Sequence, residues 1–366
     1  MRVLMISKAC VVGVYQRKLE EIAKLPGVDL RVLVPPVWRD PDRGPMPLER
    51  LHVEGYDLRA TPIRFNSHFH LHYYPELGKQ LRAFKPDIVH IDEEPYNLAT
   101  WQALRQAHQV GAKALFFSWQ NIPRDYPPPF RYMEKWVLKH GDYAIMGTDS
   151  AVHVWRAKGY RGPLAVIPQF GVDPAIYAPP ERPRQGGTFK VGYAGRLVPE
   201  KGVHLLLDAL ASLEGIWQLD IAGDGPEKGA LREQAKRLQI ADRVFFASIP
   251  AARMPAFYQS LDVFVLPSLT RPNWKEQFGR VLIEAMACGV PVIGSSSGDI
   301  PSVIGDAGLI FAEGQSDDLA DCLRRLLRDP DLRRTLALQG RQRVLDNYTQ
   351  AQIASQTVDV YHKLLG

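Results

Sequence analysis

The chain has 366 residues, of which 46% are hydrophobic and 23% are charged, a composition typical of soluble globular proteins. This length exceeds what one ordinary hydrophobic core needs, so we expect two domains. No run of about 18 apolar residues is present, and residues 1–12 have a strand pattern, so neither a membrane-spanning helix nor a signal peptide is expected. Cys10, Cys288 and Cys322 are far apart and in apolar surroundings, which favours a reducing, cytoplasmic compartment over a disulfide framework.

The net charge of +5 lies entirely in the first half of the chain. Residues 1–180 contain 23 lysines and arginines against 18 acidic residues, whereas residues 181–366 contain 22 of each. A basic half is compatible with peripheral membrane contact or with an anionic acceptor, although an ordinary basic surface is the simpler interpretation. The sequence has neither a dense Lys/Arg cluster nor a recognisable nucleic-acid-binding module, which argues against DNA or RNA as partners.

The first half alternates short apolar strands with helices, and this alternation predicts a parallel, doubly wound sheet. A loop around Gly13 leads from the first strand into the first helix. The expected strands cover residues 2–7, 28–34, 86–92, 112–118, 143–146 and 164–167, and the expected helical segments cover residues 13–25, 75–84, 98–108, 126–140 and the stretch from 150.

Two segments of this half match metal-binding patterns on paper. The D-x-D pattern of residues 40–42 lies in a Pro- and Asp-rich stretch, residues 35–47, that predicts a loop. Three alternating histidines in residues 67–72 would share one face of a strand, where zinc could bind, although a polar strand face is commoner. We therefore predict no metal site. The histidines concerned are His68, His70 and His72.

Polar side chains follow two of the expected strands directly. Glu93 and Glu94 come after the strand of residues 86–92, and Gln120 and Asn121 come after the next strand. Open α/β sheets bind ligands at the carboxyl ends of their parallel strands. These four side chains are our candidates for acceptor binding.

Residues 170–188 contain four prolines and three glycines with little periodicity, which predicts a linker. The alternation of strands and helices then restarts, so we expect a second Rossmann-like domain and a ligand-binding cleft between the two. We place the first domain at 1–172, the linker at 173–188 and the second domain at 189–347, with a final helix at about 348–366 packed back on the first. Strands are expected at 189–194, 217–222, 244–247, 263–266 and 290–293, and helices at 203–213, 228–238, 251–260, 280–288, 318–327, 331–347 and 351–365.

Residues 276–293, EQFGRVLIEAMACGVPVI, predict a loop, a helix and a buried strand. Gly279 would open the helix and let a ligand approach its first turn, and Gly289 would end it. Glu276 precedes the helix, whereas Glu284 lies inside it among apolar residues, where a carboxylate needs a partner. Sugar hydroxyls would serve as that partner, and the helix N-terminus between the two acids suits a phosphate.

Two loops of the second half suit phosphate binding to different degrees. Arg196 and Lys201 lie in a Gly-bounded loop before a helix, and two such cations suit a diphosphate whose negative charge grows as it departs. Residues 223–229, GDGPEKG, are one residue off the dinucleotide pattern. The proline of this segment fits a turn better than a pyrophosphate grip, so the segment is weak support for NAD.

These motifs make the second half similar to the family-4 retaining glycosyltransferases of the GT-B fold, also called glycosyl transferases group 1. The similarity rests on residues 195–202, 222–226 and 276–293, in that order, and covers nearly the whole second half. Residues 168–174, PQFGVDP, resemble the family's P-x-G-V-D motif, and the final helix resembles its crossover helix. In the first half the similarity is looser.

The sequence departs from the family pattern at two places in the first half. The family often has a Gly-Gly pair after the first strand, whereas here only Gly13 is present. Many members have a histidine at the end of the strand of residues 112–118, where this chain has Trp119, Gln120 and Asn121. Any role of that histidine is therefore in doubt, and Gln120 is the candidate substitute.

The resemblance implies a nucleotide-sugar donor in the second domain and an acceptor in the first, two Rossmann-like sheets facing a central cleft, and no cofactor. Arg196 and Lys201 would hold the diphosphate, Glu276 the sugar hydroxyls and Glu284 the ribose hydroxyls. Ile249 and Pro250 would lie beside the base, and the Gly13 loop would approach the phosphates. The full set is Arg196, Lys201 and Glu276 as catalytic residues, Gly13, Gly195, Gly223, Ile249, Pro250, Gln277, Phe278, Gly279, Arg280 and Glu284 as donor contacts, and Glu93, Glu94, Gln120 and Asn121 as acceptor contacts.

The expected activity is metal-independent, retaining transfer of a hexose from a UDP-glucose-like or GDP-mannose-like donor to a glycan, lipid or small-molecule hydroxyl. The leaving phosphate would take the acceptor's proton. Two alternatives from other classes are a nucleotide-sugar-binding or scaffold protein and an NAD-dependent oxidoreductase. The second needs a G-x-G-x-x-G loop after the first strand, which this chain lacks. An epimerase of the same fold is disfavoured by the two acids of residues 276–284.

Overall fold

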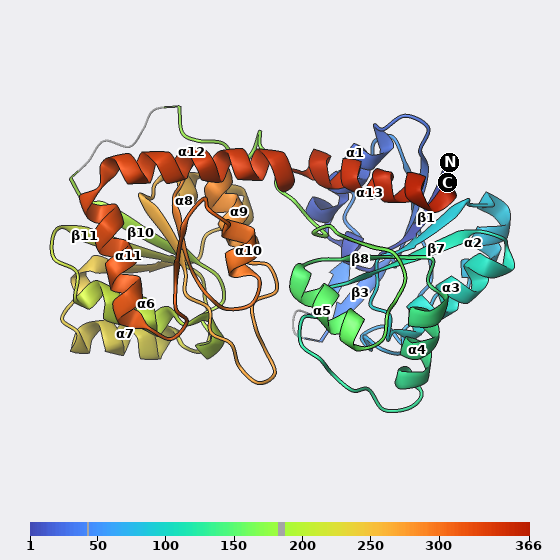
Figure 1. The fold of residues 1–366 in the computed structure, drawn as a ribbon, viewed down its shortest axis with the longest axis horizontal. Helices are drawn as coiled ribbons and strands as arrows, with labels where there is room; N and C mark the ends of the chain where they lie inside the picture. Colours follow the sequence, from blue (N-terminus) through green and yellow to red (C-terminus); the bar gives the residue numbers. More distant parts are fainter. Residues whose placement is uncertain (42–43, 182–186) are drawn as a thin grey trace. The chain divides into compact units, whose positions relative to one another are not determined.

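The computed structural model describes residues 1–41, 44–181 and 187–366, which form two compact α/β units (Figure 1). The first unit comprises Met1–Phe170 together with Gln350–Gly366, and the second comprises Gly171–Thr349. The stretch expected as a linker, 173–188, falls in the second unit, and its residues 182–186 lie outside the described residues.

The first unit is built on a parallel sheet that has seven strands within the described residues, in the order β5-β2-β1-β6-β7-β8-β9. The strand order reverses between β1 and β6, and ligands bind at the carboxyl ends of strands at such a reversal. The strands are β1 (Arg2–Ile6), β2 (Asp29–Val34), β5 (Asp57–Ala60), β6 (Ile88–Ile91), β7 (Lys113–Ser118), β8 (Tyr143–Met146) and β9 (Leu164–Val166).

Helices cover both faces of this sheet, so its strands are apolar on both sides. Val3 and Met5 of β1 belong to one core cluster, and Leu4 and Ile6 belong to the other. The C-terminal helix α13 packs against α1 in the first of these clusters (Figure 1). There the Tyr361 hydroxyl oxygen lies 2.7 Å from the Nδ1 atom of His90. The helices are α1 (Arg17–Ala23), α2 (Leu77–Phe84), α3 (Leu98–Gln109), α4 (Phe130–His140), α5 (Asp149–Ala157) and α13 (Gln350–Leu365).

The second unit has the same architecture, with a parallel sheet of six strands among the described residues in the order β12-β11-β10-β13-β14-β15. Its strand order reverses between β10 and β13. The strands are β10 (Phe189–Ala194), β11 (Trp217–Ala222), β12 (Val244–Ala247), β13 (Val263–Leu266), β14 (Val292–Ser295) and β15 (Leu309–Phe311). The helices are α6 (Val203–Ala211), α7 (Lys228–Arg237), α8 (Met254–Gln259), α9 (Arg280–Ala287), α10 (Ile300–Ile304), α11 (Ser316–Arg328) and α12 (Pro330–Asn347).

One expectation about the first unit is wrong, and one conditional interpretation is excluded. The stretch expected as a loop contains an antiparallel hairpin of β3 (Val37–Asp40) and β4 (Gly44–Pro47), because Trp38 is buried in the core and anchors it. Residues 67–72 are not a strand: the His72 amide donates to the His68 carbonyl in a turn, which leaves His68 exposed and His72 buried. The histidines therefore share no strand face, which removes the basis for the zinc site.

Two general features of the chain concern its cysteines and its helices. Cys10, Cys288 and Cys322 are free and buried, and burial raises the pKa of each of the first two thiols to about 12. Within the described residues, none of the helices combines the length and the apolar character that crossing a membrane requires.

Candidate active site

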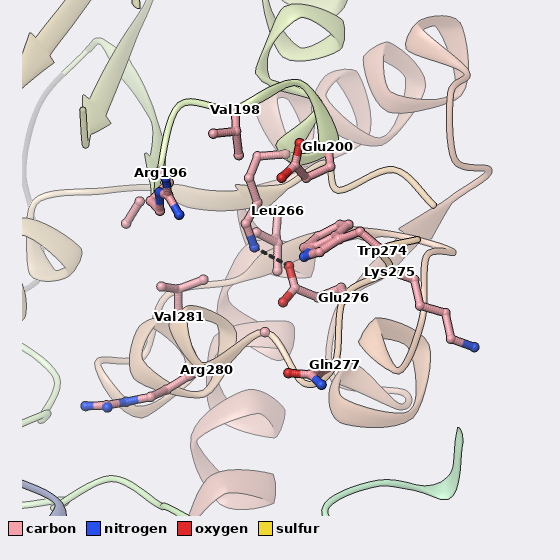
Figure 2. A pocket seen from close by; sticks show the side chains of 14 residues that line it. Arg196, Val198, Glu200, Leu266, Trp274, Lys275, Glu276, Gln277, Arg280 and Val281 are labelled. Carbon is pink, nitrogen blue, oxygen red and sulfur yellow. Dashed lines mark hydrogen bonds and ion pairs between the residues drawn. The ribbon is translucent and has the colours of Figure 1, made fainter. Parts of the chain in front are cut away.

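A cavity of about 380 Å³ lies in the second unit at the carboxyl ends of β10 and β13 (Figure 2). Two loops and the start of α9 enclose it, which brings together seven of the residues selected from the sequence. Figure 2 shows Lys275 and Arg280 extending away from Glu276. The Lys201 ammonium contacts the Glu276 carboxylate. The lining residues are Ala194, Gly195, Arg196, Val198, Glu200, Lys201, Leu266, Trp274, Lys275, Glu276, Gln277, Gly279, Arg280 and Val281.

Lys201 and Glu276 form an ion pair on the wall of this cavity. The Lys201 Nζ atom lies 2.6 Å from Glu276 Oε2, and the Ser268 hydroxyl donates to the same oxygen at 2.9 Å. The Lys201 ammonium also lies 4.9 Å from the centre of the Trp274 ring, at cation–π distance. These contacts fix a cation and a carboxylate side by side, although 75 residues separate them in sequence.

Close backbone contacts position the loops that carry this pair. Gly202 has φ +64°, and a Cβ atom there would lie 2.0 Å from the Pro267 carbonyl oxygen. Gly298 has φ +57°, and a Cβ atom there would lie 1.9 Å from the carbonyl oxygen of Glu276. Both positions need glycine because a side chain would clash with main chain rather than with a movable side chain. The backbone around Lys201 and Glu276 is therefore held by direct contact.

Helix α9 begins as the sequence indicated, with Gly279 as its N-cap in the left-handed conformation. Glu284 is buried inside this helix, where its carboxylate accepts from the Tyr258 hydroxyl at 2.8 Å and pairs with Arg280 at 2.9 Å. Burial raises the pKa of Glu284, and the Arg280 and Tyr258 contacts oppose that rise. Glu284 is thus partnered within the helix and does not line the cavity.

Four other expected donor contacts lie outside the cavity lining. Gly223 packs directly against the loop that carries Arg196, since a Cβ atom at Gly223 would lie 2.0 Å from the Gly195 carbonyl oxygen. Phe278 is buried and its ring packs edge-on against Tyr348. Ile249 and Pro250 follow β12, with Ile249 half-buried and Pro250 exposed.

The first unit has its own cavity, of about 240 Å³, at the carboxyl ends of β1, β6 and β7. Glu93 and Glu94 line it as expected, together with several aromatic rings that the sequence did not single out. The lining residues are Lys8, Ala9, Val12, Tyr15, Trp38, Asp40, Met46, Phe69, Asp92, Glu93, Glu94, Phe117, Trp119 and Gln169.

The two adjacent glutamates of this cavity have opposite pKa shifts. Burial alone would raise the pKa of Glu93, but the Lys8 ammonium and His72 outweigh it and hold the pKa at about 2. Glu94 accepts from the Ser118 hydroxyl at 2.5 Å and from the Trp119 amide at 2.8 Å, yet burial raises its pKa to about 7. One carboxylate is therefore always ionised near neutral pH, and the other titrates there.

Three further candidates of the first unit lie beside this cavity rather than on its wall. Gln120 and Asn121 are buried, and the Gln120 amide donates to the Ile122 carbonyl at 2.9 Å. Gly13 is buried in a 3₁₀ turn, and its amide donates to the Glu49 carboxylate at 2.6 Å. Trp119, rather than Gln120, is the residue after β7 that lines the cavity.

Sequence reasoning missed four residues that complete the two cavities. Ser268 and Trp274 contact the Lys201–Glu276 pair, and Trp38 and Gln169 line the first-unit cavity. Ser268 lies two residues after the end of β13, close to the kind of strand-end position that selected Glu93. Trp274 and Gln169 lie in irregular segments, and Trp38 lies in β3, a strand that the sequence did not predict, so periodicity gave no information about which way these side chains point.

Comparison with known proteins gives matches along both halves of the chain. The family model "Glycosyl transferases group 1" matches residues 178–343, and "Glycosyl transferase 4-like domain" matches residues 12–169. N-acetyl-alpha-D-glucosaminyl L-malate synthase of Bacillus anthracis is 37% identical over 150 residues, 40% of this chain and 38% of that protein. A GDP-mannose-dependent alpha-(1-6)-phosphatidylinositol monomannoside mannosyltransferase of Mycolicibacterium smegmatis is 34% identical over 205 residues, 51% and 54% of the two chains. The chain thus spans 38% of the length of the first relative and 54% of the length of the second.

The solved structure of Anabaena HepE in complex with UDP matches the fold over nearly the whole length. Its TM-score is 0.74 at 19% identity, covering 99% of this chain and 100% of that one. At this identity the likeness establishes the fold alone, and it agrees with the two parallel-sheet units described above. The chain has the GT-B fold and belongs to the group 1 glycosyltransferases of family 4.

Proposed function

We propose that this protein is a retaining, metal-independent glycosyltransferase that moves a hexose from a nucleoside-diphosphate sugar to an acceptor hydroxyl. The observation that carries the proposal is the Lys201–Glu276 ion pair, which lines one cavity with Arg196. A diphosphate needs cations and a sugar needs hydrogen-bond acceptors, so this pairing suits both parts of such a donor.

In this proposal each side chain of the second-unit cavity has a distinct role. Arg196 and Lys201 bind the diphosphate, and an ammonium with three donors can bind a phosphate oxygen while keeping Glu276. Glu276 accepts from hydroxyls of the donor sugar, and Gln277 and Gly279 contribute the adjoining loop. Glu284 would bind the ribose by exchanging Arg280 or Tyr258 for a hydroxyl.

The chemistry then depends on positioning and on charge stabilisation. The departing phosphate accumulates negative charge beside Arg196 and Lys201 and takes the proton of the acceptor hydroxyl. The acceptor attacks on the face that the phosphate leaves, so the anomeric configuration is retained. The donor class is supported by the name of one similar protein, which is GDP-mannose-dependent.

A thermal-shift screen with UDP-, GDP- and ADP-sugars tests donor binding, because a ligand at 100 times its Kd stabilises by about 2.7 kcal/mol. Release of nucleoside diphosphate from the selected donor then tests for chemistry, and the anomeric proton coupling of the product tests retention. Stabilisation without any release would identify a nucleotide-sugar-binding protein instead, and inversion of the anomer would refute the retaining assignment.

Lys201→Ala is the decisive variant, and we expect it to lose about 10²–10³ in kcat. Lys236→Ala is its matched control, because Lys236 forms an exposed ion pair with Glu233 on α7. Equal activity of the wild type and Lys201→Ala would rule out the proposed role of the ion pair.

The proposal includes peripheral contact with an anionic membrane through α4. Arg131, Lys135 and Lys139 are exposed at four-residue spacing on this helix, and Tyr132 is 64% exposed beside them. Co-sedimentation with vesicles containing phosphatidylserine, but not with phosphatidylcholine vesicles, is the expected result. Replacing the three cations with glutamine should abolish it.

A further inference from the structure

The first-unit cavity is acidic, although it belongs to the half of the chain that carries the excess of basic residues. Among the residues that the structure describes, Asp40, Asp92, Glu93 and Glu94 line it, and Lys8 is the one cation of this lining. From this wall we infer that the acceptor is a cyclic polyol bearing an amino group, and that acceptors carrying phosphate or carboxylate are disfavoured. The inference deepens the proposed function, on which it rests, by naming the acceptor class.

The one cation on the wall is already neutralised. The Lys8 ammonium pairs with Glu93, and the same carboxylate lies 3.5 Å from the Nε2 atom of His72. Asp92 accepts from the Ser7 hydroxyl at 2.6 Å and from the Gln169 amide at 2.9 Å, both uncharged donors. These bonds hold the Asp92 carboxylate in place without cancelling its charge.

With all four carboxylates ionised, the described lining residues have a formal charge of −3, and with Glu94 protonated they have −2. Glu94 titrates near pH 7, so the wall is negative on both sides of neutrality. Low-dielectric walls strengthen the field of such charges inside a cleft. An entering anion would meet this field at close range, whereas an ammonium group would be attracted by it.

Aromatic rings add a second preference for a cation. The Trp38 and Phe69 rings lie 5.5 Å apart, and the Lys8 ammonium lies 5.7 Å from the first and 5.8 Å from the second. An ammonium group is therefore already stabilised here by ring faces and a carboxylate together. Phe69 is 44% exposed, so part of this aromatic surface is open to a ligand.

The size and the polar groups of the cavity suit a single ring. Its volume of about 240 Å³ lies below the roughly 300–1,000 Å³ usual for drug-sized ligands. Carboxylate oxygens each have more than one lone pair, so Asp92 and Glu94 can accept from ligand hydroxyls in addition to their present donors. A hydroxylated six-membered ring with an amino group matches the space, the acceptors and the charge.

The test compares three acceptors that share one ring: streptamine, which carries two amino groups, myo-inositol, and myo-inositol 1-phosphate. With the donor selected above, we expect kcat/KM to be highest for streptamine and at least tenfold lower for the phosphate. A kcat/KM for myo-inositol or its phosphate that equals or exceeds that for streptamine would overturn the inference.

Variants that neutralise one carboxylate test whether the acceptor preference arises from the lining of this cavity. Glu94→Gln and Asp40→Asn should each lower the streptamine-to-phosphate ratio of kcat/KM about fivefold, and Glu76→Gln, an exposed acid outside the cavity, should leave it unchanged. Two positions are changed separately so that the test still stands if one variant misfolds. Circular dichroism would detect such misfolding. An unchanged ratio in both folded variants would contradict the inference.

Donor hydrolysis separates this inference from the proposed function. If the protein releases nucleoside diphosphate but prefers the phosphorylated ring, only the acceptor class is wrong. If it turns over no donor, the proposed function fails, and saturation-transfer NMR with streptamine and myo-inositol 1-phosphate decides the cavity's preference directly. Binding of streptamine alone would support the inference, and binding of the phosphate or of neither would refute it.

Discussion

The two units share one architecture but place opposite charges at the same position in it. In each, the strand order of a parallel sheet reverses, and a cavity lies at the carboxyl ends of the strands beside that reversal. Among the described residues, the lining of the second-unit cavity has four cations and two carboxylates, whereas the lining of the first-unit cavity has one cation and four carboxylates. The net charges of the two halves of the chain differ in the opposite sense: the first half, which contains the acidic cavity, has +5, and the second half has zero. The total charge of a domain therefore does not predict the charge of its binding site.

The largest expected effect concerns the Lys201–Glu276 ion pair of the second-unit cavity. Glu276→Gln keeps the shape of the side chain but removes the charge that Lys201 and Ser268 contact. We expect kcat to fall about 10²–10³-fold, as for loss of one preorganised charge contact. Steady-state transfer kinetics measure this, with the melting temperature as the control for folding. A loss confined to KM would show that Glu276 only binds the donor.

The next effect concerns the backbone contact that positions Glu276. In Gly298→Ala a methyl group would meet the Glu276 carbonyl at a positive φ, and we expect a loss of stability of about 1–3 kcal/mol. Gly229→Ala is the matched control, because Gly229 lies in α7 with no atom within 4 Å of the added methyl. Helix propensity predicts a gain of about 0.5–1 kcal/mol there. Urea denaturation measures both, and equal shifts would show that the close approach is unimportant.

The acidic cavity predicts a specific dependence of stability on pH. The pKa of Glu94 rises from 4.5 to about 7 on folding, so its favourable contribution is complete below pH 4.5 and is lost as pH rises to about 7. The pKa of Glu93 falls to about 2, so its contribution is lost only as pH falls below 4.5. The wild type should therefore lose stability relative to Glu94→Gln between pH 4.5 and 7. Urea midpoints across this range test it, and parallel curves would contradict it.

The smallest effect tests whether the first unit takes any part in donor binding. The resemblance to the family implies that the Gly13 loop approaches the donor phosphates, but the Gly13 amide already donates to Glu49. If the donor must displace this carboxylate, Glu49→Ala should lower KM for the donor by about two- to fivefold. Glu54→Ala, at another exposed acid of this unit, is the control. An unchanged KM would confine the donor to the second unit.

Regular patterns carried most of the architecture from the sequence alone. The alternation of apolar strands and helices predicted two doubly wound sheets, which the structure confirms, and β11, β12 and β13 have the expected bounds. Gly279 and Gly289 bound α9 as expected, because a left-handed residue at a helix end strongly favours glycine. Arg196, Lys201 and Glu276 were selected by motif, and they do line one cavity.

Contacts between irregular segments could not be predicted in the same way. The β3–β4 hairpin depends on burial of Trp38, a tertiary contact that a Pro-rich stretch does not indicate locally. Glu284 was expected to need an outside partner, but Arg280, one turn earlier in the helix, supplies one. The acidity of the first cavity arises from two separate segments, Asp40 and residues 92–94, so no local window of sequence contains all four acids.

The burial of all three cysteines has a practical consequence for studying the two units. Thiols react as thiolates, and a pKa near 12 leaves almost none of that form at Cys10 or Cys288 under ordinary conditions. Maleimide dyes should therefore not react with the native thiols and should attach only to cysteines introduced on the surface. The native cysteines therefore need not be replaced before labelling, and a pair of fluorophores on introduced cysteines can report movements of the protein.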